Sequence, residues 1–223
     1  MNKDRPPTAT VFLRLLAHDD KPAALAKAVD RLRNGEPSPD IHVVDPESFR
    51  KVPGSPFAYW VSEKVRTQFE ERQALECPNL NRMARRGVGT NDDFRFLRLR
   101  FEGIESRRER PPLAKEIVFA RFYSSLPLIL EWRENGAQLK KFCIQNGNSP
   151  SRNIRSESEY YRRGLTWSLR TQSGLSIKVM PDGCVFGSKD PAVFVGGDEH
   201  KMLLALLAIT NSRAFGVLVE LQM

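Results

Sequence analysis

Residues 160–194 form an alternating, strand-like stretch that carries paired aromatics, several basic residues and a series of turn glycines. These residues contain no pattern typical of a metal-binding site, a catalytic triad or a phosphate-binding loop. Basic and small polar groups presented on β-structure are instead suited to contact with a polyanion. The stretch therefore favours a β-rich fold with a surface that reads a ligand, rather than a catalytic centre.

Helical periodicity lies toward both ends of the chain and alternation lies in its middle, which predicts an α+β fold. We expect an N-terminal helical linker, a β-rich recognition lobe and a C-terminal helical pair, the first of the pair capped by Asp198. The first expected helix is capped by Asp19 or Asp20 and runs to residue 33, and the others span residues 45–49, 56–72, 136–143, 198–209 and 212–223. The expected strands span residues 8–16, 41–44, 95–102, 126–132, 166–171, 174–180 and 184–186.

Both ends of the sequence look incomplete. The strand expected at residues 8–16 has no evident partner nearby, and the last helix has no stop signal before Met223. These two features predict that the chain is part of a larger protein.

The charge of the chain favours an anionic partner. Thirty-five Lys and Arg stand against 27 Asp and Glu, which gives a net charge of +8 and a pI near 9.6. Residues 81–110 alone hold nine Arg against five acids, and Arg suits forked contacts to phosphate or guanine. The three cysteines and three histidines are scattered, which argues against a metal site or a disulfide framework. The sequence has neither an apolar leader nor a long apolar run, so we expect a cytoplasmic protein without a membrane partner.

The turn at residues 87–92 is the first candidate for contact with DNA. Its glycines would let backbone amides approach a phosphate, and an ordinary loop between two strands is the alternative interpretation. Arg85 and Arg86 precede the turn and would contact phosphates or form a solvated charged face. The candidate DNA-binding residues in this region are Arg85, Arg86, Gly87, Gly89, Thr90 and Asn91.

A second group of candidates lies within residues 160–194. Arg170, Thr171 and Gln172 lie between two expected strands, where Arg would pair with guanine and Gln with adenine. Lys178 and Lys189 are expected to anchor phosphates.

The order of several segments resembles the C-terminal half of large bacterial adenine-specific DNA methyltransferases. The resemblance is strongest to those of type IIG restriction–modification and BREX-type phage-defence systems. It is carried, in order, by residues 53–66, 87–101, 130–140, 160–194 and 204–221. It implies a target recognition domain at residues 81–198, preceded by the tail of a methylase domain with its linker at 1–52 and a spacer helix at 53–80. Residues 199–223 would then be truncated C-terminal helices.

The family's catalytic motifs are absent from this sequence. Neither its methyl-donor loop nor its Asn-Pro-Pro-aromatic tetrapeptide occurs, and the Pro-Pro pairs at residues 6–7 and 111–112 follow Arg instead. That tetrapeptide binds and stacks the flipped adenine, so we expect the chain to be inactive alone, with no catalytic residue, metal or cofactor of its own. S-adenosylmethionine is implied only for the intact methyltransferase. Residues 115–123 also depart from the Gly-rich run typical of the family.

The resemblance implies sequence-specific recognition of double-stranded DNA, as a fragment of an adenine-specific methyltransferase. Two alternatives stay open at this point. The chain could be a non-functional remnant of a truncated methylase gene. It could also be a protein–protein module that docks on a separate methylase catalytic domain or a defence complex.

Overall fold

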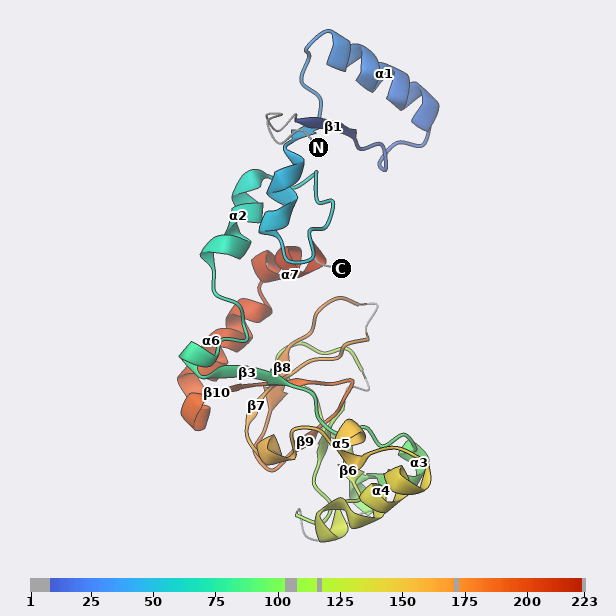
Figure 1. The fold of residues 1–223 in the computed structure, drawn as a ribbon, viewed down its shortest axis with the longest axis vertical. Helices are drawn as coiled ribbons and strands as arrows, with labels where there is room; N and C mark the ends of the chain where they lie inside the picture. The colour runs from blue at the N-terminus through green and yellow to red at the C-terminus, as the bar shows by residue number, and fades with distance from the viewer. Residues whose placement is uncertain (1–8, 103–107, 116–117, 171–172, 222–223) are drawn as a thin grey trace, which may run out of the picture. The chain divides into compact units, whose positions relative to one another are not determined.

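The computed structural model describes residues 9–102, 108–115, 118–170 and 173–221, and its fold is α+β, as expected (Figure 1). The chain divides into two compact units. Unit 1 comprises Met1–Gln73 with Leu218–Met223, and unit 2 comprises Ala74–Val217. Each unit is described separately.

Unit 1 begins with a two-stranded antiparallel sheet, in which β1 (Thr10–Leu13) pairs with β2 (Ile41–Val44). The expectation that the first strand lacks a partner is therefore wrong. Between the two strands lies α1 (Lys21–Arg33), which begins where expected because the Asp20 carboxylate accepts a hydrogen bond from the amide of Ala23 at 3.0 Å. The partner of β1 is thus supplied from beyond an intervening helix.

The helix α2 (Glu63–Glu71) is shorter than the helix expected at residues 56–72. Residues 56–62 are not helical, and Ser62 occupies the N-cap position with extended φ and ψ of −64° and 151°. The buried Arg66 side chain reaches back from the helix and donates to the Ala58 carbonyl oxygen at 3.1 Å. This contact holds the preceding segment as a loop against α2, although its apolar residues have helical spacing.

A four-stranded antiparallel sheet forms the centre of unit 2, with the strand order β3-β10-β7-β8. The four strands are β3 (Arg82–Arg85), β7 (Gly164–Thr166), β8 (Lys178–Met180) and β10 (Ala192–Val195). Every residue of the central strand β10 is at most 2% exposed. The sequence did not predict β3 or β10. The strand β8 is the end of the strand expected at residues 174–180, whereas β7 shares only Thr166 with the strand expected at residues 166–171.

Two further strand pairs lie toward the other end of unit 2. The antiparallel pair is β4 (Leu97–Leu99) with β6 (Leu128–Leu130), and the parallel pair is β5 (Leu113–Ala114) with β9 (Val185–Phe186). The strand expected at residues 95–102 is only partly confirmed. Asp92 accepts a hydrogen bond from the amide of Arg95 at 3.1 Å and caps the short helix α3 (Asp93–Phe96), so the strand begins only at Leu97.

The helices of unit 2 lie at both ends of its sheets (Figure 1). Figure 1 shows α3, α4 (Arg133–Gln145) and α5 (Pro150–Asn153) grouped at one end, whereas α6 (His200–Thr210) contacts β7 and β10. The helix α7 (Arg213–Glu220) includes residues of both units. The 3-10 turn η1 (Pro46–Lys51) belongs to unit 1. Those of unit 2 are η2 (Pro78–Leu80), η3 (Arg100–Glu102), η4 (Glu157–Glu159) and η5 (Gly196–Asp198).

Asp198 does not cap α6, contrary to expectation. Its carboxylate accepts hydrogen bonds from the Arg162 guanidinium at 3.0 and 2.5 Å, and Glu199 occupies the N-cap position without a side-chain bond. The ion pair raises the pKa of Arg162 further above its ordinary value, chiefly through the hydrogen bond to Asp198. Within the described ranges, α6 and α7 satisfy the length and hydropathy criteria for a membrane span only as a pair bent by 65°, and no single helix does so.

Two apolar clusters form the core of unit 2. The larger surrounds Phe96, Leu130 and Phe186, and the smaller joins Leu165 of β7 and Val193 of β10 to the buried face of α6. Fully burying side chains of this size contributes about 1.5–3 kcal/mol each. The two clusters fix the sheet from opposite sides, and the loops that leave its strands are positioned by it.

Candidate nucleic-acid interface

Unit 2 carries a groove of about 440 Å³ lined by basic residues, which we call the basic groove. Its remaining described lining residues are neutral, so none of those that line it is acidic. All five of its cationic side chains belong to exposed residues. The five are Arg86, Arg152, Arg155, Arg170 and Lys189.

Backbone hydrogen bonds assemble the groove from segments far apart in the sequence. The amide of Gly87 donates to the Gly187 carbonyl oxygen at 3.1 Å, which lays the turn after β3 beside the segment after β9. The amide of Gly89 donates to the Asn153 carbonyl oxygen at 2.7 Å and attaches the end of α5 to the same turn. A Cβ atom at Gly87 would lie 1.9 Å from the Phe186 carbonyl oxygen, so this close approach requires glycine.

Five of the residues predicted from the sequence line the basic groove together. Arg86 and Gly89 come from the turn after β3, where Asn91 adopts a left-handed φ of 57°. Arg170 follows β7, and Lys189 precedes β10. The two stretches singled out from the sequence are therefore neighbours in the fold.

The other predicted residues lie elsewhere. Arg85 is half-buried and donates to the Glu76 carboxylate at 2.7 Å, which neutralises its charge locally. Lys178 is only 3% exposed, and this burial is inconsistent with its expected role as a phosphate anchor. Gly87 and Thr90 are also buried. Gly87 packs closely against Phe186, and Thr90 lines a neighbouring hollow rather than the basic groove. Thr171 and Gln172 lie outside the described residues.

Arg152 and Arg155 are groove residues that the sequence did not single out. Residues 145–155 were expected to be a polar loop, but Pro150 starts the short helix α5 there. The Arg155 side chain donates to the Arg152 carbonyl oxygen at 2.9 Å, so the end of α5 sets its position. The sequence pattern that could have identified them is the pair of Arg three positions apart, just after a Pro that can begin a helical turn.

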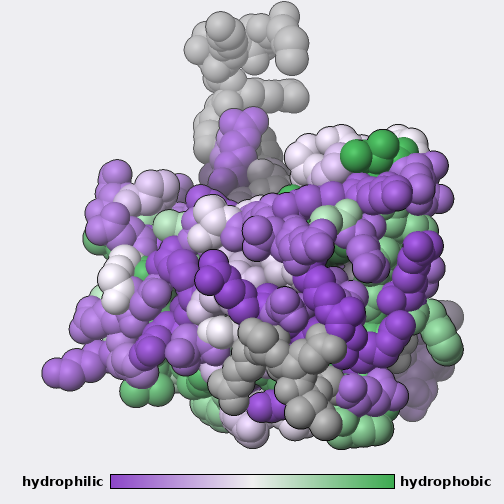
Figure 2. Space-filling view, turned by 90° about the horizontal axis from the view of Figure 1, so that it is seen from below, coloured by the Kyte–Doolittle hydropathy of each residue, from purple (hydrophilic) through white to green (hydrophobic). Residues whose placement is uncertain are grey.

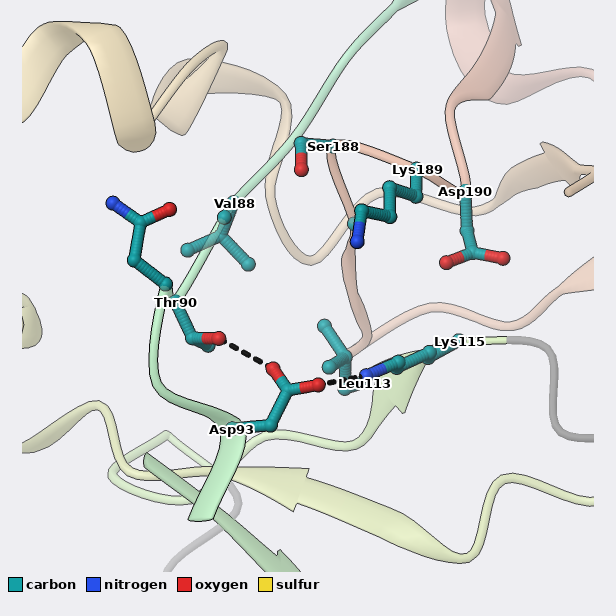
Figure 3. Close-up of a pocket in the computed structure, with 11 residues that line it drawn as sticks. Val88, Thr90, Asp93, Leu113, Lys115, Ser188, Lys189 and Asp190 are labelled. Carbon is teal, nitrogen blue, oxygen red and sulfur yellow. Dashed lines mark hydrogen bonds and ion pairs between the residues drawn. The ribbon is translucent and has the colours of Figure 1, made fainter. Parts of the chain in front are cut away.

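A second, smaller hollow adjoins the basic groove, and we call it the side pocket (Figure 3). Its volume is about 280 Å³. Figure 3 shows Asp93 between Thr90 and Lys115, both of which donate hydrogen bonds to its carboxylate. The side pocket and the basic groove share Gly89, Asn91, Ser188 and Lys189.

Asp93 is one of two carboxylates that line the side pocket, with Asp190. Burial acts to raise the pKa of its carboxyl group, but the hydrogen bonds from Lys115 and Thr90 outweigh that effect. The charges of Lys115 and Lys189 add to them, so the pKa of Asp93 lies below its ordinary value. Asp93 is therefore ionised at neutral pH and accepts hydrogen bonds at the pocket.

The aromatic pair at residues 160–161 contributes mainly to packing. Tyr160 is 4% exposed, and its ring makes edge contacts with Trp132 and Phe186, each with centroids 5.5 Å apart. Burial, followed by the nearby Glu157 carboxylate, raises the pKa of the Tyr160 phenol far above its ordinary value. Tyr160 therefore stabilises the fold beneath the groove rather than contacting a ligand.

The chemistry that this surface offers is binding of an anion. Figure 2 shows that one face of the molecule is mainly hydrophilic, with hydrophobic residues chiefly toward its margins. In the described part of the chain, no group of three His, Cys, Asp or Glu could hold a metal ion. Clustered guanidinium groups bind phosphate esters through forked, charge-assisted hydrogen bonds.

The fold and the groove define a mixed α+β module with a basic surface supported by an antiparallel sheet. The chain is similar to two curated proteins. It is 25% identical over 174 residues to the adenine-specific methyltransferase BrxX of Escherichia coli O9:H4 (strain HS). It is 27% identical over 188 residues to the adenine-specific methyltransferase PglX of Lacticaseibacillus casei (strain Zhang). No family model matches the chain.

These similarities cover most of this chain but little of the relatives. The aligned regions span 74% and 78% of the chain, and 13% and 15% of the respective relatives. The chain is therefore distantly related to a part of adenine-specific methyltransferases.

Proposed function

We propose that this chain recognises double-stranded DNA, and that it corresponds to the target recognition region of an adenine-specific DNA methyltransferase from a restriction or phage-defence system. The observation that carries the proposal is the basic groove. Five exposed cations from four separate segments converge there, and none of the described residues lining it is acidic. An unopposed cluster of this kind fits a phosphate backbone, because each phosphate contact releases condensed counterions.

We assign different roles to the cations of the groove. Arg86, Arg152, Arg155 and Lys189 would contact phosphates and set the register of the protein on the duplex. Arg170 would contact a base edge, where its forked guanidinium pairs with the O6 and N7 atoms of guanine. Arg170 is exposed and lines the groove, as this role requires.

Methyl transfer itself would belong to a separate catalytic domain. The sequence lacks the Asn-Pro-Pro-aromatic tetrapeptide and the methyl-donor loop, so S-adenosylmethionine would be bound by that domain. The similarity to two adenine-specific methyltransferases supports this division of labour.

The test is a salt titration of DNA binding. Fluorescence anisotropy with a labelled mixed-sequence duplex should give an affinity that falls linearly on a double-logarithmic salt plot. Four phosphate-facing cations predict a slope of about −3.6. Absence of binding at low salt would contradict the proposal. Salt-insensitive co-purification with a separate methylase would instead favour a docking module.

A further inference from the structure

The side pocket differs from the basic groove in its charge. Its lining includes two cationic residues, Lys115 and Lys189, and two anionic residues, Asp93 and Asp190. These formal charges cancel, whereas the described lining of the groove carries cations alone. A phosphate is therefore expected in the groove, and a group without net charge is expected in the side pocket.

The walls of the side pocket select for a small ligand with apolar faces. Val88 and Leu113 are the apolar residues of its lining, and each is only 3% exposed, so the apolar surface that they offer is small (Figure 3). Its volume of about 280 Å³ lies just under the range of roughly 300–1,000 Å³ found for sites of drug-sized ligands. A single nucleobase has this combination of small size, apolar faces and polar edges.

We propose that the side pocket binds one unpaired guanine of a DNA strand whose neighbouring phosphates occupy the basic groove. This inference rests on the proposed DNA binding. The Asp93 carboxylate would accept hydrogen bonds from guanine N1–H and from its exocyclic amino group, since a carboxylate accepts two parallel donors. The Lys115 ammonium, which has three donors, would keep its bond to Asp93 and donate another to guanine O6.

The arrangement of the side pocket and the basic groove is consistent with binding of a base that is unstacked from its neighbours. A paired base shows only its edges in the grooves of a duplex, while its faces are covered by its neighbours. Contact with Val88 and Leu113 requires exposed faces, as in other proteins that read an extruded base. Ser188 and Lys189 line both hollows, so a base in the side pocket would remain beside the phosphates of its own strand.

The experiment compares DNA duplexes that differ only in one bulged nucleotide. Five labelled duplexes carry a bulged G, A, C or T, or are fully paired, and the full chain is titrated against each by fluorescence anisotropy. We expect the bulged-G duplex to bind about tenfold more tightly than the other four. The paired duplex must pay the cost of extrusion, and bulged A, C or T lacks the adjacent N1–H, amino and O6 groups that would face Asp93 and Lys115. Asp93→Asn should abolish the preference for G, since one acceptor oxygen becomes a donor amide.

Asp182→Asn is the matched control, because it makes the same chemical change in an exposed turn that lines neither hollow. It should keep the preference for bulged G. Equal affinity of the wild-type chain for all four bulges would overturn the inference, even if Asp93→Asn proved unstable. Binding of every duplex without preference would leave the proposed function standing, whereas no binding to any duplex would overturn both.

Discussion

Removal of Arg152 and Arg155 should change the salt dependence of DNA binding by a calculable amount. Each phosphate contact contributes about 0.9 to the slope of log affinity against log salt. Four contacts give a slope of about −3.6, and the double variant Arg152→Ala/Arg155→Ala should reduce it to about −1.8. Between 50 and 200 mM salt the wild-type affinity should then fall by roughly 150-fold, and that of the variant by roughly 12-fold.

The assay is an anisotropy titration of one labelled duplex at four or more salt concentrations. Lys141→Ala/Lys201→Ala serves as the control, because it removes the same charge from two exposed residues of unit 2 that do not line the groove. The control should keep the wild-type slope, since net charge alone does not set the number of phosphates contacted. If both double variants lowered the slope equally, binding would follow net charge, and the assignment of these two arginines to phosphates would be wrong.

Three further predictions concern stability and activity. Gly87→Ala should lower the free energy of unfolding in urea by about 1–3 kcal/mol, because the added Cβ would clash with the Phe186 carbonyl oxygen. Gly216→Ala in α7 is the control, since its Cβ would contact no other atom, and it should be neutral or stabilising. Burial raises the pKa of the Tyr160 phenol, so the stability that it contributes is complete below about pH 10 and declines as the pH rises further. Tyr160→Phe should reduce that alkaline decline in thermal unfolding, and an unchanged pH profile would contradict the assigned burial. The chain alone should not transfer labelled methyl groups from S-adenosylmethionine to DNA, and incorporation above a protein-free blank would refute this.

The elements that the sequence predicted well are those set by local interactions. The helix α1 begins at Lys21 because the Asp20 side chain caps it, and β2 matches its expected bounds because alternation and flanking turns define it. The strands β3 and β10 were missed for a different reason. Residues 192–195 form a continuous apolar run buried on both faces, and residues 82–85 contain two arginines and become a strand only by pairing with that run.

The candidate site could be predicted in part, because charge and turn chemistry identified Arg86, Gly89 and Lys189 without any knowledge of their proximity. Arg152 was missed because it joins the groove through a backbone bond between Gly89 and Asn153, which are distant in sequence. A contact between residues so distant in the sequence cannot be predicted from a local sequence pattern.

Lys178 shows why charge alone does not tell whether a side chain in a strand is exposed. Its expected role as a phosphate anchor required an exposed side chain within the strand expected at residues 174–180. In the structure Lys178 is 3% exposed, whereas its apolar neighbour Val179 is 36% exposed. Residue Phe122 pairs with Lys178 in a parallel bridge, and its amide donates to the Ile177 carbonyl oxygen at 3.0 Å, so the edge of β8 is covered. When another segment covers the edge of a sheet, the polarity of a residue no longer predicts whether its side chain is exposed to solvent. Exposure at such positions depends on segments distant in the sequence and can be determined only from the fold.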